Sequence, residues 1–192
     1  MTTQLFTLLG VALGAFSSYL VSFLGERTRY RRDISGHWTE RKLESYARYL
    51  SDAKYMSTLT RRVAASVGLD DQALALSRDE GLPLLAEAET KRGLSSEVVS
   101  LIGGKATVEA HRRVNKALWR MEQLARGLIK GSGREEWVQA RREYVNAMND
   151  FHENARLDLI VPGEYTPRDT KYLMASDDSL NDSGARTCQS SS

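Results

Sequence analysis

Cysteine, histidine and a surplus of either charge are all scarce in this sequence, and each shortage excludes a class of protein. Cys188 is the only cysteine among 192 residues, so the chain forms no intramolecular disulfide and no cysteine-based zinc site. Basic residues (27) and acidic residues (25) nearly balance and are interleaved, whereas nucleic-acid-binding proteins usually carry a sustained basic excess. Nucleic acid is therefore not an expected partner.

The three histidines do not stand in the patterns that metal sites require. A di-iron site in a helical bundle needs glutamate three residues before histidine, but His37, His111 and His152 follow isoleucine, valine and asparagine at that spacing. His-Glu-x-x-His, Gly-x-Ser-x-Gly and the Walker pattern are absent from the sequence as well. We therefore assign no catalytic, cofactor-binding or metal-binding residue, and favour a protein that is not an enzyme. His111 falls on an apolar row, which predicts a partly buried core histidine.

One long apolar run is present near the start of the chain. It extends from Leu5 to Leu24, contains no charged residue, and as a helix would span about 30 Å, the thickness of a bilayer's hydrocarbon core. A cleaved signal peptide would carry basic residues before the run and a small-residue cleavage site after it, and neither is found. Four arginines follow instead, which places that end in the cytoplasm by the positive-inside rule: Arg27, Arg29, Arg31 and Arg32. We predict a single-pass protein of the cell membrane with its N-terminus outside.

The anchor and the four arginines that follow it carry the only site residues the sequence suggests. The arginines would lie at the lipid head groups, where each contributes about 1 kcal/mol of attraction to an anionic surface. They could equally serve only as a topology signal. Gly10 and Gly14 form a Gly-x-x-x-Gly motif that lets two membrane helices approach closely, so a homodimer is possible. Glycine is also common in such helices without any dimerisation.

The rest of the chain shows apolar residues at steps of three and four, as in amphipathic helices. Short glycine turns at 103–104 and 131–133 separate the later rows, so an all-α fold is expected, with three to four helices in an antiparallel bundle. The rows are Trp38, Leu43, Tyr46, Ala47, Leu50, Ala53, Met56, Leu59, Val63 and Val67; Leu85, Ala88, Leu94, Val98 and Leu101; Val108, His111, Val114, Leu118, Met121, Leu124 and Leu128; and Trp137, Ala140, Tyr144, Met148, Phe151 and Ala155.

Local signals refine these boundaries. Residues 69–82 are ambiguous, since 73–76 could form a short helix and 79–81 read as a loop, after which Pro83 suits a first helical position. Ser132 and Glu135 form a capping box for the last helix. The polar composition after Pro162 predicts a largely disordered tail. The expected organisation is an anchor at 1–25, a basic stalk at 26–37, a bundle at 38–161 and a tail at 162–192, with the tryptophans Trp38, Trp119 and Trp137 as core anchors.

Three stretches resemble a known group of sequences. They are Trp38 to Leu50 after the anchor and arginines, Ala117 to Gly127, and Glu136-Trp137. In these stretches the chain resembles an uncharacterised actinobacterial family of single-pass, N-terminally anchored helical membrane proteins. The resemblance covers about residues 5–160 and implies the architecture described above. It implies no activity and no catalytic residue.

Two functions are compatible with the sequence. The first is a membrane-tethered interaction or scaffold module at the cytoplasmic face, with membrane lipids and other proteins as partners. The alternative is a small-molecule-binding or enzymatic helical domain with a pocket between the bundle helices. A polar cavity with converging charges would favour the second function, and a filled core would favour the first.

Overall fold

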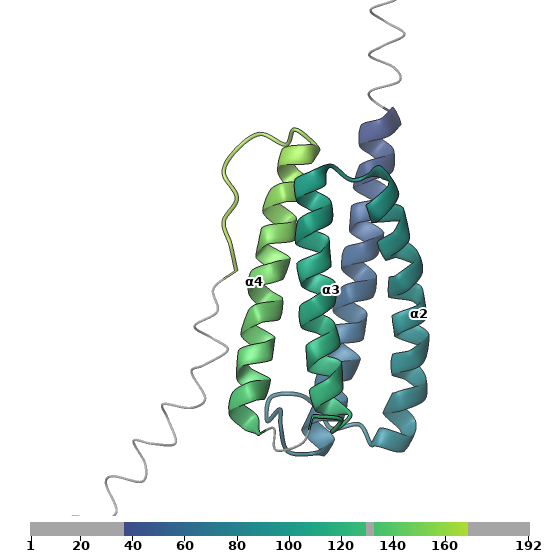
Figure 1. Ribbon diagram of the computed structural model, residues 1–192, viewed down its shortest axis with the longest axis vertical. Coiled ribbons are helices and arrows are strands. Elements are labelled where there is room, and N and C mark those ends of the chain that lie inside the picture. Colours follow the sequence, from purple (N-terminus) through teal and green to yellow (C-terminus); the bar gives the residue numbers. More distant parts are fainter. Residues whose placement is uncertain (1–36, 130–132, 169–192) are drawn as a thin grey trace, which may run out of the picture. The chain divides into compact units, whose positions relative to one another are not determined.

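A computed structural model describes residues 37–129 and 133–168 of the chain (Figure 1). Internal contacts divide the chain into two units, 1–41 and 42–192, and the fold below is that of the second. The described residues form helices and no strands: a helix over 37–66, α2 (Arg78–Ile102), α3 (Lys105–Ala125) and α4 (Arg134–Asp158). The all-α helical bundle predicted from the sequence is confirmed.

The predicted anchor lies outside the described residues, together with Gly10, Gly14 and the four arginines Arg27, Arg29, Arg31 and Arg32. Within the described ranges, no helix combines the length and the apolar character needed to cross a bilayer. The anchor, its orientation and its dimerisation motif therefore stay predictions.

The four helices run alternately up and down, with short connections at each end (Figure 1). Their buried faces meet in one apolar core, where the rings of Tyr46 and Tyr49 pack against Phe151 at centroid distances of 5.8 and 5.3 Å. All six residues predicted for the last row are buried, including Trp137. Such burial of large apolar side chains is the main stabilising contribution to a bundle of this size.

Two of the three predicted tryptophan anchors were wrong. Trp119 is 60% exposed and Trp38 is 56% exposed, while Leu43, Val67 and Leu128 at the ends of the predicted rows are also exposed. The middle of the predicted row is confirmed, since these members are buried: Tyr46, Ala53, Met56, Leu59 and Val63. Tyr49 and Thr60, which the row left out, are buried on the same face. The two tyrosines take inward positions because their hydroxyl groups find hydrogen-bond partners there.

Helix α2 contradicts its predicted row most clearly. Leu85 and Ala88 are buried as expected, but Leu94, Val98 and Leu101 face outward, with Leu101 83% exposed. The inward residues that the row left out are mostly small: Gly81, Ser95, Ser96 and Val99. A methyl group added at Gly81 would lie 2.4 Å from Val63 Cγ2, so the close approach of the two helices decides which face of α2 turns inward.

The start of α2 also differs from the prediction. Residues 73–76 are not helical, and the expected loop at 79–81 is the first turn of α2. The Ser77 hydroxyl oxygen caps the helix by accepting the backbone N–H of Glu80 at 3.3 Å. Because the helix begins at Arg78, Pro83 lies inside it and not at its first position. In the preceding loop, the buried Asp70 accepts two backbone N–H groups and pairs with Arg61 at 2.9 Å.

The Gly103–Gly104 turn was predicted correctly, and Asp158 explains its geometry. The Asp158 carboxylate accepts the backbone N–H of Gly104 at 3.0 Å, a hydrogen bond from the Tyr46 hydroxyl group, and an ion pair from Lys42 at 2.9 Å. A side chain at Gly104 would collide with it, since an added Cβ would lie 2.8 Å from Asp158 Oδ1. One carboxylate thus joins the ends of three helices.

The capping box of α4 is displaced by one residue from its predicted place. The helix begins at Arg134 with Gly133 as its cap, and the Glu136 carboxylate accepts the Gly133 N–H at 2.8 Å. Glu136, not Glu135, therefore serves the helix end, and Ser132 lies outside the described residues. Glycine has no side-chain oxygen, so only the glutamate half of the box is present.

Residues 161–168, called the strap below, include the beginning of the tail that the sequence predicts to be largely disordered over 162–192. After α4 ends, the chain turns and runs back along that helix (Figure 1). Asn149 fixes the strap by accepting the Tyr165 hydroxyl group at 3.0 Å and exchanging two backbone hydrogen bonds of 3.1 Å with Arg168. The Tyr165 ring also stacks on His152. Only the part of the predicted tail beyond Arg168 lies outside the described residues.

Candidate functional site

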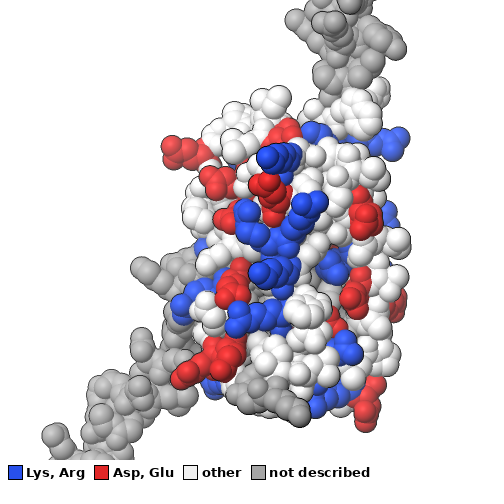
Figure 2. Space-filling model, viewed as in Figure 1, with Lys and Arg blue, Asp and Glu red and all other residues white. Residues whose placement is uncertain are grey.

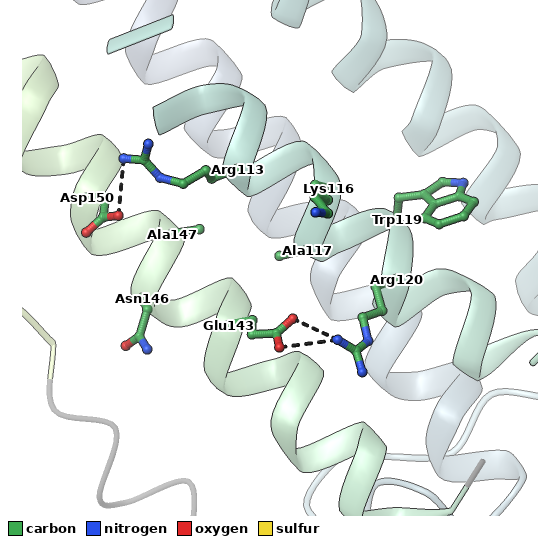
Figure 3. Close-up of a pocket in the computed structure, with 9 residues that line it drawn as sticks. All are labelled: Arg113, Lys116, Ala117, Trp119, Arg120, Glu143, Asn146, Ala147 and Asp150. Atoms are coloured by element: carbon green, nitrogen blue, oxygen red, sulfur yellow. Dashed lines mark hydrogen bonds and ion pairs between the residues drawn. The ribbon is translucent and has the colours of Figure 1, made fainter. Parts of the chain in front are cut away.

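A groove between α3 and α4 lies on the surface of the described part of the chain (Figure 3). It encloses about 520 Å³ and is open to solvent. Five lining residues come from α3 and four from α4: Arg113, Lys116, Ala117, Trp119, Arg120, Glu143, Asn146, Ala147 and Asp150. We call this set the groove.

Two alanines form the floor of the groove. Ala117 and Ala147 face each other across the helix pair (Figure 3), and each is only 6% exposed. Because neither side chain extends past its methyl group, the helices leave room between them at this level. The floor is apolar and accommodates an apolar side chain better than a charged one.

An ion pair closes each end of the floor. Arg113 pairs with Asp150 at 3.2 Å, and Arg120 donates to both carboxylate oxygens of Glu143 at 3.2 Å (Figure 3). The two arginines are seven residues apart, about 10 Å along α3. All four side chains are between two-fifths and about half exposed, so each pair contributes at most about 1 kcal/mol and can exchange partners at little cost.

The α3 side of the groove adds a cation and an aromatic ring. Lys116 lies between the two arginines, and among the described residues it has no carboxylate partner. Trp119 points away from α4 (Figure 3) and is 60% exposed. Figure 2 shows a band of basic side chains running along this face over α3. Three cations against two carboxylates, next to an exposed tryptophan, make a surface suited to an acidic partner.

A second polar group of residues lies inside the bundle. The Asn115 side-chain oxygen accepts the Tyr49 hydroxyl group at 2.9 Å and Arg92 Nη1 at 2.6 Å. Its nitrogen must therefore donate, and it lies 2.9 Å from His111 Nε2 and 3.0 Å from Ser96 Oγ. We call Tyr49, Arg92, Ser96, His111 and Asn115 the polar cluster.

These contacts fix the protonation of His111. Nε2 accepts from Asn115 and from the Ser96 hydroxyl group at 2.6 Å, so the proton resides on Nδ1, which donates to the Val108 carbonyl at 3.3 Å. Burial lowers the pKa of His111, and the nearby Arg112 and Arg92 charges lower it further. His111 is therefore neutral, and it lies in the core, as its place on an apolar row predicted.

The polar cluster has part of the geometry of a catalytic nucleophile and its base, but a substrate cannot reach it. Ser96 and His111 are within hydrogen-bond distance, as an activated serine requires. Both are buried, at 7% and 2% exposed, and Tyr49 covers the imidazole ring at a centroid distance of 5.0 Å. Arg92 Nε is also buried without a partner. The cluster thus acts as a polar element of the core.

None of the groove residues was predicted as a site. Trp119 was interpreted as a core anchor, and the ion pairs join residues of different helices that the sequence cannot align. Over residues 37–129 and 133–168 no three metal-binding side chains come together. Comparisons of the chain with family models, with curated proteins and with solved structures find no match.

Proposed function

We propose that this protein is a membrane-tethered docking module, in which the groove receives a short acidic segment of a partner protein. The groove carries this proposal: an alanine floor between two exchangeable ion pairs, with Lys116 and Trp119 on one side. An apolar side chain of the partner would enter over Ala117 and Ala147. Acidic residues on either side of it would pair with Arg113 and Arg120.

The filled core supports docking over catalysis. Four large aromatic side chains of the core are at most 2% exposed: Trp137, Tyr46, Tyr49 and Phe151. A small-molecule-binding or enzymatic domain would draw on the polar cluster, where Ser96 and His111 are enclosed by the packed helices. The predicted anchor and the four arginines support a location at the inner face of the membrane.

Site-specific photocrosslinking in native membranes tests the proposal. A photoreactive residue replaces Asn146 in the groove of the full chain, and in a control chain it replaces Glu89, which is exposed on α2. Adducts should form at Asn146 alone and should disappear when Arg113, Lys116 and Arg120 are changed to glutamate. Mass spectrometry of the captured segment should find an apolar residue flanked by acidic ones.

Two results would contradict this function. One is the same set of adducts at Asn146 and Glu89, which would indicate random collision. The other is adducts that persist in the charge-reversed chain, since the groove would then not recognise acidic residues.

A further inference from the structure

We infer that the groove also has an occupant within the chain itself, the acidic segment 176–183, which competes with the partner. This inference rests on the proposed function and names a regulation of the same site. The segment reads Ser-Asp-Asp-Ser-Leu-Asn-Asp-Ser and carries three aspartates and no basic residue. Leu180 is its only apolar residue.

The order of residues in the segment matches the order of features in the groove. Leu180 has Asp178 two residues before it and Asp182 two residues after it. In an extended chain these aspartates are about 13 Å apart, close to the roughly 10 Å that separates Arg113 and Arg120 along α3. Leu180 would then lie over the alanine floor, with an aspartate at each arginine. Asp177 adds a third negative charge next to Asp178.

The strap delivers the segment to the groove. It runs back along α4 and is fixed at Asn149 through Arg168, the last described residue. Asn149 lies beside Asp150 on α4, and Asp150 lines the groove. Leu180 lies twelve positions after Arg168, a span of up to about 40 Å, whereas one helix is about 10 Å wide.

Tethering makes a weak contact sufficient. A short linker raises the local concentration of the segment to the millimolar range, so millimolar affinity gives substantial occupancy. The exposed ion pairs at Arg113 and Arg120 exchange their carboxylates at low cost, as described above. A partner must displace the segment. The partner's apparent affinity therefore falls as the fraction of chains with an occupied groove rises.

Disulfide trapping in the full chain tests the inference. In a Cys188→Ser background, Asn146→Cys in the groove is combined with Ser179→Cys beside Leu180, and the protein is placed in zwitterionic vesicles and oxidised briefly. The matched control keeps both cysteines and changes Asp177, Asp178 and Asp182 to asparagine. A second control moves the groove cysteine to Glu89 on α2.

The intrachain disulfide should form about tenfold faster in the acidic chain than in the neutralised chain, the effect expected from losing two partly exposed ion pairs and one further negative charge. Raising the salt concentration should remove that difference. Equal rates in the acidic and neutralised chains would overturn the inference. So would equal trapping at Glu89, or a disulfide that joins two chains, because the occupant would then be a second copy.

Photocrosslinking at Asn146 separates this inference from the function on which it rests. Neutralising the three aspartates should increase partner adducts several-fold if the segment competes for the groove. If partner adducts form but the disulfide rate does not depend on the aspartates, only the internal occupant is refuted. A rate that depends on the aspartates, without any partner adduct, would refute the docking function and leave the internal contact standing.

Discussion

Two glycines in α2 should respond in opposite directions to the same substitution. At Gly81, a new methyl group would lie 2.4 Å from Val63 Cγ2, more than 1 Å inside ordinary carbon–carbon contact. Val63 is fully buried and β-branched, so its side chain cannot rotate away freely. At Gly93, in the same helix, no atom lies within 4 Å of the new methyl group.

The magnitudes follow from two opposing terms. Replacing a helical glycine by alanine stabilises by up to about 1 kcal/mol, whereas overpacking a core costs about 1–3 kcal/mol. Gly93→Ala should therefore raise the free energy of unfolding by up to about 1 kcal/mol. Gly81→Ala should lower it by up to about 2 kcal/mol, the difference between overpacking and propensity.

Urea unfolding followed by circular dichroism at 222 nm measures both changes. The collision at Gly81 is isolated by adding Val63→Ala: the double variant should be less destabilised than the sum of the two single variants by about 1 kcal/mol. If Gly81→Ala stabilises the protein as Gly93→Ala does, the close approach of α2 to the helix over 37–66 is wrong. The outward orientation of Leu94 and Leu101 would then be in doubt as well.

Three further outcomes are expected. Asp70→Asn should lower the free energy of unfolding by about 3 kcal/mol in urea titrations. The reason is that the buried Arg141, 3.6 Å from the Asp70 carboxylate, would lose its full counter-charge. A loss below about 1 kcal/mol would contradict this. Burial lowers the pKa of His111 from its usual 6.5, so the stability that its neutral form contributes is complete above pH 6.5 and is lost as the pH falls towards the folded-state value. His111→Gln should flatten that dependence between pH 7.5 and 5. The variant His152→Gln measures the separate share of His152, a half-buried histidine whose pKa burial also lowers. Finally, the full chain should resist carbonate extraction from membranes, and a mature form that begins beyond residue 15 would refute the predicted anchor.

The sequence pattern was reliable where large apolar residues alone define a face. In α4, Trp137, Met148 and Phe151 stand at helical steps among polar neighbours, and all are buried. In α2 the same pattern failed after Ala88, because small residues such as Ser95 and Ser96 take inward positions there. A count of apolar residues gives Leu94 and Leu101 more weight than Gly81 or Ser95, although close helix packing requires the small ones.

The groove could not be predicted, for a different reason. Its floor is Ala117 and Ala147, which carry no signal in a sequence, and its ion pairs become visible only when α3 and α4 are aligned. Trp119 was the one available signal, and a tryptophan on a helix is more often buried than exposed. The strap was missed because its order depends on Asn149, a residue of another element.

The carboxylate of Asp158 has a consequence for how the chain folds during its synthesis. Its partner Tyr46 lies 112 residues earlier, so at about 5–20 residues per second the two emerge from the ribosome roughly 6–22 seconds apart. Phe151, which packs against Tyr46 and Tyr49, arrives only shortly before Asp158. During that interval the helix over 37–66 has an apolar face against which α4 has not yet packed. Premature termination inside α4 would leave that face exposed permanently. Such fragments should aggregate or be degraded, although three of the four helices are complete.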